Sequence, residues 1–74
     1  MKKRDYFITN GRENKWQIVA YSFKDAARKL YKFLGKEWFI KRRLSAIYCD
    51  FKIKVDGYMI KKSIWICGNG KTMK

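Results

Sequence analysis

The sequence of 74 residues predicts a small single α+β domain in which a β-hairpin, two helices and a second β-hairpin follow one another, in the order ββααββ. Two turn pairs predict the hairpins, because Asn10-Gly11 and Asp56-Gly57 each lie between runs of alternating apolar and polar residues. Between the hairpins, apolar residues recur at helical spacing within residues 22–46. The length fits one domain that spans the whole chain and has a thin core.

The first hairpin is expected to pair residues 5–10 with residues 15–21. A loop of residues 12–14 extends the turn pair between them. The second strand carries partly apolar side chains on both faces: Trp16, Ile18 and Ala20 on one, and Gln17, Val19 and Tyr21 on the other. The sequence therefore allows this hairpin to pack on two sides.

Residues 22–34 predict an amphipathic helix with a signal at each end. Ser22 is a good N-cap, because its hydroxyl can accept a hydrogen bond from a free backbone N–H of the first turn. Asp25 adds a negative charge that suits the positive end of the helix, and Gly35 ends the helix because it tolerates a positive φ. Spacings of three and four residues place on one face Phe23, Ala26, Ala27, Leu30, Tyr31 and Leu34.

The next segment, residues 37–46, is expected to form a shorter helix, although a strand would also accept its three consecutive apolar residues at 38–40. Ile40, Leu44 and Ile47 fall at helical spacing, which favours the helix. The opposite side of this helix would carry a cationic triplet, Lys41, Arg42 and Arg43.

The second hairpin is predicted from Asp56-Gly57, because both central residues of a type I′ turn need a positive φ. Its strands are expected at residues 48–55 and 58–67. This register places Ile53 opposite Ile60 and Phe51 opposite Lys62. The inner face would be apolar, with Phe51, Ile53, Val55, Tyr58, Ile60, Ile64 and Ile66, and the outer face would carry Lys52, Lys54, Met59, Lys61, Ser63 and Trp65. Residues 1–4 and 68–74 are expected to be flexible.

The composition is strongly basic, with 19 Lys and Arg against 6 Asp and Glu and a formal net charge of +13. Self-repulsion of this size opposes the compact state, so a polyanionic partner would stabilise it. Nucleic acid is the usual partner of this kind, since neutralised phosphates release their counterions. A membrane fits less well, because no apolar run approaches the ~20 residues that cross a bilayer and no lone amphipathic helix is expected. Charge that serves only solubility stays open as an alternative.

The residue types argue against an enzyme. The chain contains no histidine, which is the commonest general acid–base residue. Its Asp and Glu residues are expected to cap a helix, to form a turn or to make ion pairs at the surface. Cys49 has no visible base that could activate it as a nucleophile. A zinc site needs four ligands, so we expect no metal and no cofactor. Because no export signal is visible, Cys49 and Cys67 are expected to be reduced, and the protein to be cytoplasmic.

Two helices joined at a glycine meet the physical needs of a helix-turn-helix, in which the second helix enters the major groove of duplex DNA. The triplet Lys41, Arg42 and Arg43 would then face the groove. Phosphates would be contacted from the first helix and from the second hairpin by Lys24, Arg28, Lys29, Lys32, Lys52, Lys54, Lys61 and Lys62.

Several short motifs resemble those of small phage and prophage helix-turn-helix proteins. They are Ser22-Phe23-Lys24-Asp25-Ala26-Ala27, Leu30, Ile40, Arg43-Leu44 and Gly57-Tyr58-Met59-Ile60. The resemblance implies a small regulator that binds duplex DNA inside a bacterial host. A homodimer also stays open, because the core of so short a chain is thin and a second copy could contribute to it.

Two other functions stay open. Small, basic, aromatic-rich proteins can inhibit a host nuclease, CRISPR effector or polymerase by docking into its nucleic-acid groove. Such proteins can also bind single strands, because aromatic side chains stack on bases with ~1–3 kcal/mol per base. The aromatic side chains suited to either role are Trp38, Tyr48 and Trp65, although core packing is open for each of them.

Overall fold

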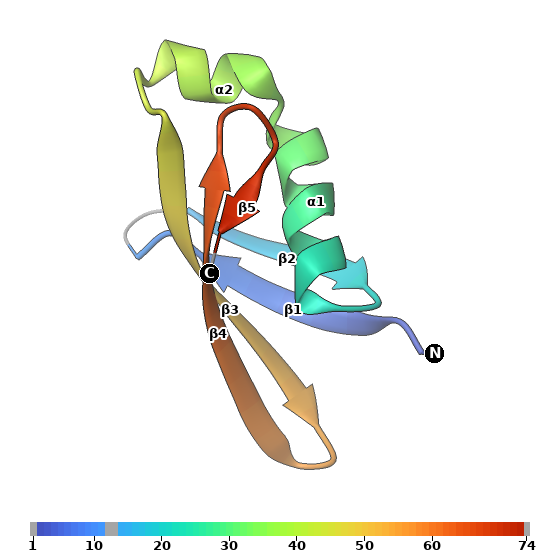
Figure 1. Ribbon diagram of the computed structural model, residues 1–74. Helices are drawn as coiled ribbons and strands as arrows, with labels where there is room; N and C mark the ends of the chain where they lie inside the picture. The colour runs from blue at the N-terminus through green and yellow to red at the C-terminus, as the bar shows by residue number, and fades with distance from the viewer. Residues whose placement is uncertain (1, 12–13, 74) are drawn as a thin grey trace.

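The structure is a computed structural model that describes residues 2–11 and 14–73. It confirms the α+β class and the order ββααββ, and it adds a short fifth strand (Figure 1). The elements are β1 (Arg4–Thr9), β2 (Lys15–Ala20), α1 (Phe23–Leu34), α2 (Lys36–Lys41), β3 (Ala46–Val55), β4 (Tyr58–Cys67) and β5 (Thr72–Met73). Arg12 and Glu13 of the predicted first loop lie outside the described residues.

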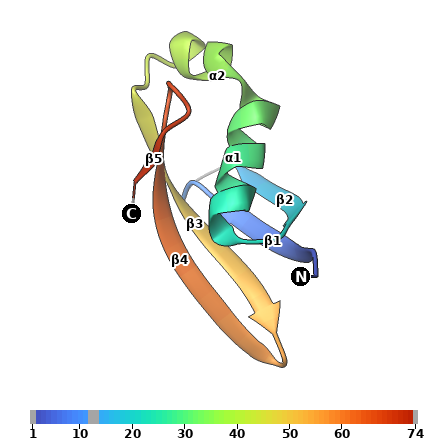
Figure 2. The ribbon, with the colours of Figure 1, turned by 45° about the vertical axis from the view of Figure 1, so that its right-hand side comes forward.

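The five strands form one antiparallel sheet in the order β2-β1-β3-β4-β5. The two hairpins therefore lie side by side, joined by the pairing of β1 with β3, in which Ile8 lies opposite Phe51. α1 lies over one face of this sheet, and α2 runs from the end of α1 across the end of the sheet at which β3 begins (Figures 1 and 2). Among the described elements, none lies over the other face.

The core lies between α1 and the helix-facing side of the sheet. Exposed and buried residues alternate along the strands, because successive side chains point to opposite faces. The largest fully buried side chains are Phe39, Phe51, Leu30, Ile66 and Cys49. The other buried apolar residues are Tyr6, Ile8, Ala20, Ala26, Ala27, Ile47, Ile53 and Ile64. The first hairpin packs on this side only, although its sequence allowed packing on both.

α1 is capped as the sequence predicts. Ser22 Oγ accepts a hydrogen bond from the backbone N–H of Asp25 at 3.0 Å, and the Asp25 carboxylate accepts one from the backbone N–H of Tyr21 at 3.1 Å. At the other end, Gly35 has a φ of 81°, and its N–H donates to the Tyr31 carbonyl at 2.8 Å. Among the described residues, neither helix is long and apolar enough to span a membrane.

The second helix is shorter than predicted, and the expected helix over residues 37–46 is wrong in its second half. Arg43 adopts a φ of 54°, a left-handed conformation that ends helical hydrogen bonding. Ile40 is 62% exposed, so the apolar face inferred from spacing does not exist. Phe39 alone is buried from α2, and Ala46 already pairs in β3. The last residues that helical spacing had assigned to α2 therefore belong to β3, where they pair with β4.

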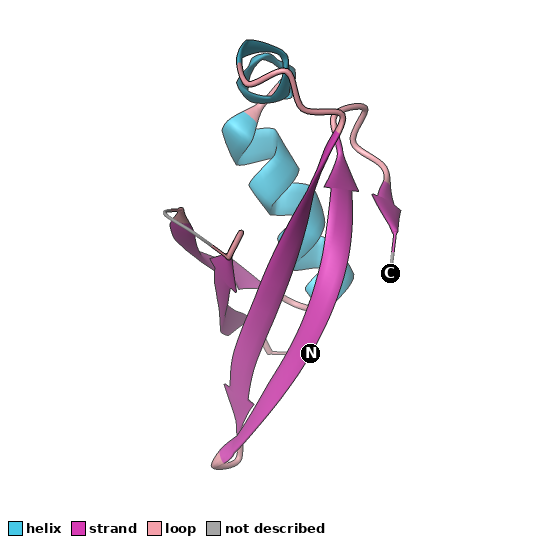
Figure 3. Cartoon of the chain, turned by 90° about the vertical axis from the view of Figure 1, so that its left-hand side faces the viewer, coloured by secondary structure: helices cyan, strands magenta, loops and turns pink. Residues whose placement is uncertain are grey.

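The second hairpin has the register that its turn predicts. Asp56 and Gly57 both have positive φ, 49° and 85°, and Val55 pairs with Tyr58. The same register places Ile53 opposite Ile60 and Phe51 opposite Lys62, as expected. Beyond its pairing with β1, this hairpin continues as a two-stranded ribbon, residues 53–60, which we call the arm (Figure 3).

The last described residues are tied to the fold, although the sequence suggested a flexible tail over residues 68–74. Thr72–Met73 form β5, which pairs with β4. The Gly68 N–H donates to the Ser45 carbonyl at 2.8 Å, and the Gly68 carbonyl accepts the Tyr31 hydroxyl at 2.9 Å. These bonds connect the tail both to the start of β3 and to α1.

Candidate nucleic-acid interface

Alternate side chains of the sheet point away from the helices and form what we call the open face. The pairing registers arrange them in rows across the strands. They include Asp5, Phe7, Thr9, Lys15, Gln17, Val19, Tyr48, Asp50, Lys52, Lys54, Met59, Lys61, Ser63, Trp65 and Met73. Because no described element packs over them, these side chains are available to a partner.

Aromatic side chains occupy two places on the open face. Tyr48 lies opposite Trp65, with ring centroids 4.8 Å apart, and Met73 extends the same row from β5. Phe7 lies opposite Lys52, about 13 Å farther along the strands. Trp65, Tyr48 and Phe7 are 41%, 47% and 48% exposed, so each presents part of a ring on which a base could stack.

Lysines lie among these rings. Lys52 and Lys61 form a cross-strand pair, and Lys52 is also the neighbour of Phe7 in β1. Like charges directly opposite one another are destabilising, so an anion beside them would relieve the repulsion. Lys54 lies on the arm and Lys15 at the start of β2. The open face therefore combines stacking surfaces with positive charge on neighbouring strands.

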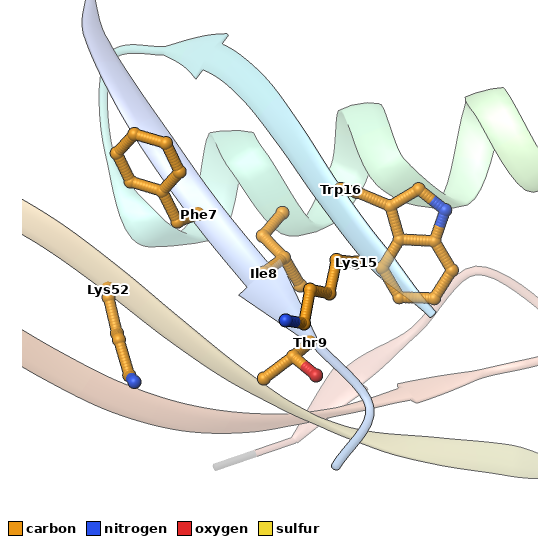
Figure 4. Close-up of a pocket in the computed structure, with 6 residues that line it drawn as sticks. All are labelled: Phe7, Ile8, Thr9, Lys15, Trp16 and Lys52. Carbon is orange, nitrogen blue, oxygen red and sulfur yellow. The ribbon is translucent and has the colours of Figure 1, made fainter. Parts of the chain in front are cut away.

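A pocket of about 230 Å³ is lined by residues of β1 and of its two neighbouring strands, β2 and β3 (Figure 4). It is lined by Phe7, Ile8, Thr9, Lys15, Trp16 and Lys52. In Figure 4, Lys15 extends toward Thr9, whereas Phe7 and Lys52 lie on the other side of the Thr9 side chain. This lining suits a nucleotide, because the Phe7 ring can stack on a base while the ammonium groups of Lys15 and Lys52 neutralise a phosphate.

The open face also contains acidic groups. Asp50 lies between Tyr48 and Lys52 on the same face of β3, and it accepts a hydrogen bond from the Ser63 hydroxyl at 2.7 Å. Asp5 lies opposite Val19 near the other end of the face. A carboxylate repels phosphate and accepts hydrogen bonds from base N–H groups. Phosphates of a bound strand would therefore lie beside the lysines rather than over Asp50.

Two of the three residues of the cationic triplet lie beyond the end of α2, which corrects the expected arrangement of a groove-reading second helix. Lys41 is the last residue of α2, Arg42 caps its C-terminus and Arg43 occupies the left-handed turn. The Arg42 guanidinium lies 4.3 Å from the centre of the Trp38 ring, within cation–π range. Trp38 itself packs edge-on against Trp16 at 6.4 Å on the helix side of the sheet. It therefore does not share a surface with Tyr48 and Trp65.

The cations of α1 lie on the helix side of the molecule. Arg28 and Lys29 pair with Asp25 at 3.4 and 3.6 Å, and Lys29 also donates to the Val19 carbonyl at 3.0 Å. Lys32 is exposed in the last turn. Arg28 and Lys29 thus stabilise the start of α1, and Lys29 also connects α1 to β2.

The predicted site residues are therefore divided between surfaces. The open face brings together Tyr48, Lys52, Lys54, Lys61 and Trp65. Lys62 lies on the opposite side of the sheet, where its Nζ is 5.8 Å from the Phe23 ring centre, so the four hairpin lysines expected to contact phosphates do not share one surface.

The sequence indicated no site role for the open-face residues that line the pocket or extend the aromatic row, namely Phe7, Thr9, Lys15 and Met73. Alternation in the first strand does place Phe7 and Thr9 on the face opposite to the buried Tyr6 and Ile8. The alternation alone did not indicate a site, because it does not show that β1 lies next to β3. For Met73 no signal was available, because a two-residue strand has no visible period.

The thiols offer little chemistry. Cys49 is fully buried, and burial, with a smaller contribution from neighbouring Asp50, raises the pKa of its thiol to about 12. It therefore stays protonated and unreactive at neutral pH. Cys49 and Cys67 are both free, and no group of three or more His, Cys, Asp or Glu that could hold a metal occurs among residues 2–11 and 14–73.

Comparison of the chain with protein-family models, with curated proteins and with solved structures found no match. The function is therefore inferred from the surfaces of the molecule itself.

Proposed function

We propose that this protein binds single-stranded nucleic acid through its open face and catalyses no reaction on it. The observation that carries the proposal is the row of exposed rings and lysines on an uncovered sheet. Bases would stack on the Tyr48–Trp65 pair and on Phe7, and phosphates would lie beside Lys52 and Lys61. Single-stranded bases are recognised on the sheets of other small domains in the same way, by exposed aromatic side chains.

The geometry supports single strands better than a groove-reading helix. α2 has six residues and spans about 9 Å, and its arginines lie at its C-terminal end, one stacked on Trp38 and the next in a turn. A recognition helix reads base edges mainly with residues of its N-terminal part. Stacking, in contrast, needs unpaired bases and exposed rings, and the open face supplies the rings.

Duplex DNA is the second candidate ligand, and the arm is the observation that favours it. The arm extends past the rest of the molecule as a two-stranded ribbon (Figure 2), and a ribbon of this kind fits the major groove. Lys54 and Lys61 would then contact phosphates. This candidate keeps the expected duplex-binding regulator but moves its contact from the second helix to the second hairpin.

Fluorescence anisotropy with labelled single-stranded and duplex oligonucleotides of one sequence tests the proposal. We expect tighter binding to the single strand. Tyr48→Ala with Trp65→Ala should weaken that binding at least tenfold, because each stacked base contributes about 1–3 kcal/mol. The matched control is Phe33→Ala, which removes a ring that is 74% exposed on α1 and should change nothing.

Three results would argue against single-strand binding through the open face. If Phe33→Ala weakens single-strand binding as much as the double variant does, the loss does not depend on rings of the open face. Tighter binding to the duplex, unaffected by the double variant, would favour the arm. Failure to bind either oligonucleotide, together with a host nuclease or polymerase that co-purifies, would favour the inhibitor function.

A further inference from the structure

A carboxylate lies in the middle of the open face, between the rings and the lysines. Successive residues on this face of β3 are Tyr48, Asp50 and Lys52, so the Cα of Asp50 is about 7 Å from the Cα of each neighbour. The strand pairing adds a hydroxyl residue on either side, Thr9 in β1 and Ser63 in β4. Asp50 is thus the centre of a polar row that separates the aromatic row from the lysine pair.

The Asp50 carboxylate has hydrogen-bonding capacity to spare. Among the described residues, its hydrogen-bond partner is the Ser63 hydroxyl, which donates to Oδ1 at 2.7 Å. The Thr9 hydroxyl on the other side is already engaged, because it accepts a hydrogen bond from the Gly11 N–H at 3.2 Å. An ionised carboxylate accepts about four hydrogen bonds through its two oxygens and donates none. Oδ2 and part of Oδ1 are therefore available to a donor of the ligand.

The charge of Asp50 is not compensated by a neighbouring cation. Both ion pairs within the described part of the chain are made by Asp25, so Asp50 forms none with Lys52, two residues along the same strand. A carboxylate at this position lowers the positive potential of the open face and repels phosphate. It contributes to binding only if a hydrogen-bond donor of a base reaches it.

The donors on the Watson–Crick edge determine which base suits a carboxylate. Guanine presents two adjacent donors there, N1–H and the N2 amino group, which match the two carboxylate oxygens. Cytosine and adenine each present one amino group beside a ring nitrogen that accepts. Thymine and uracil present one N–H between two carbonyl oxygens, which a carboxylate repels. In a single strand this edge is accessible, because the base is unpaired.

We propose that Asp50 selects guanine at the nucleotide whose base stacks on the Tyr48–Trp65 pair. The inference rests on the proposed single-strand binding and adds to it a preference for one base. The rings hold any base, because every base has a π-face. The carboxylate, one position farther along β3, accepts hydrogen bonds from N1–H and the N2 amino group at the edge of that base. Ser63 is a positioning residue, since its hydroxyl orients the carboxylate.

The test uses oligothymidylates about 7 nucleotides long whose central base is guanine, cytosine, adenine or thymine. Such a strand can slide along the open face until its central base meets Asp50, so the binding register need not be known. We expect the wild-type protein to bind the guanine oligonucleotide about tenfold more tightly than the thymine one, because a good bidentate contact discriminates between bases by about this factor. Fluorescence anisotropy at one salt concentration measures the four affinities.

Two guanine analogues test which edge of the base is read. Inosine lacks the N2 amino group and keeps N1–H, so it should lose most of the preference. In contrast, 7-deazaguanine lacks the N7 acceptor on the other edge and keeps both donors, so it should bind as guanine does. The reverse pattern would overturn the contact between Asp50 and the Watson–Crick edge.

The protein variants separate this contact from charge. Asp50→Asn keeps the shape of the side chain but turns one acceptor into a donor, so it should bind all four oligonucleotides and retain less than about a twofold preference. Asp5→Asn is the matched control, because it removes the same charge from the open face at a position opposite Val19. It should keep the full preference. Ser63→Ala should lower the preference in part and leave binding of the thymine oligonucleotide unchanged.

The outcomes distinguish base selection from the proposed function. If the wild-type protein binds all four oligonucleotides equally, base selection by Asp50 is overturned and single-strand binding stands. A guanine preference that survives in Asp50→Asn, or that is lost equally in Asp5→Asn, also overturns it. A wild-type protein that binds none of the oligonucleotides overturns the proposed function, and base selection with it.

Discussion

Asp25 links the start of α1 to the end of β2 through its charge. The backbone N–H of Tyr21, with Lys29 and Arg28 adding to its effect, holds the pKa of the Asp25 carboxyl below its ordinary value, although partial desolvation opposes the shift. A carboxyl whose pKa is lower in the folded state stabilises the fold above its unfolded pKa, and this stabilisation is lost as the pH falls through the folded pKa. The first turn of α1 is therefore sensitive to acid.

We expect Asp25→Asn to lower the free energy of unfolding at pH 7. The deficit should begin to shrink below about pH 4, where the carboxyl of the unfolded wild-type chain takes up a proton, and should vanish as the pH falls through the lower pKa of the folded state. Urea denaturation at several pH values measures both. Ser22→Ala is the control, because a hydroxyl does not titrate and its loss should cost about 1 kcal/mol at every pH. A deficit for Asp25→Asn that is independent of pH would contradict the assignment.

At the scale of elements, the end of α2 stores strain in its backbone. A non-glycine residue in the left-handed region costs roughly 1 kcal/mol, and Arg43 adopts this conformation with a φ of 54°. We expect Arg43→Gly to raise the thermal midpoint, with a gain of up to about 1 kcal/mol. Arg42→Gly is the matched control, since Arg42 has a φ of −95° and its guanidinium stacks on Trp38. That variant should be less stable than wild type, and a gain in both variants would refute the explanation.

The β3–β4 ribbon carries the charge that the open face would use. Lys52→Gln with Lys61→Gln should flatten the salt dependence of single-strand binding by about 1.4 units. The thermal midpoint should stay the same or rise, because the two ammonium groups lie opposite one another and repel. Anisotropy titrations at four salt concentrations measure the slope. An unchanged slope would remove this lysine pair from the interface.

The second hairpin and the first helix could be predicted because their signals are local. The turn pair Asp56-Gly57 sets the register, and Ser22 with Gly35 sets the helix ends, without reference to the rest of the chain. The end of α2 could not be predicted, because pairing of Ala46 and Ile47 with β4 competes with helical spacing. Such competition is decided by tertiary contacts.

The candidate site was only partly visible in the sequence for the same reason. Lys52, Lys54, Lys61 and Trp65 were placed on one face from the register of a single hairpin. Phe7 and Lys15 join them only through the strand order, which brings β1 beside β3. Short-range sequence patterns do not indicate which strands lie side by side in the sheet.

At the scale of the whole molecule, the charge of +13 is distributed over both sides of the sheet. The open face holds one group of lysines, and α1 holds another group of cations. Repulsion between like charges opposes folding, and salt screens it. The fold is therefore expected to gain stability from screening and, more strongly, from a bound polyanion.

We expect sodium chloride to raise the thermal midpoint modestly, and an oligothymidylate at about 100 times its dissociation constant to raise it by on the order of 10 °C, since such binding contributes about 2.7 kcal/mol. Differential scanning fluorimetry at matched ionic strength separates the two effects. Tyr48→Ala with Trp65→Ala should retain the effect of salt and lose most of the effect of the oligonucleotide. Equal responses in both proteins would assign the stabilisation to charge alone.

The pairing of β1 with β3 also determines when the open face forms during folding. Each hairpin can close through its own turn within microseconds, whereas Ile8 and Phe51 come from opposite halves of the chain and meet only when two preformed units dock. Contacts between distant parts of a chain are the slow ones. Refolding should thus be limited by this docking, and Phe7 becomes a neighbour of Lys52 only at that final step.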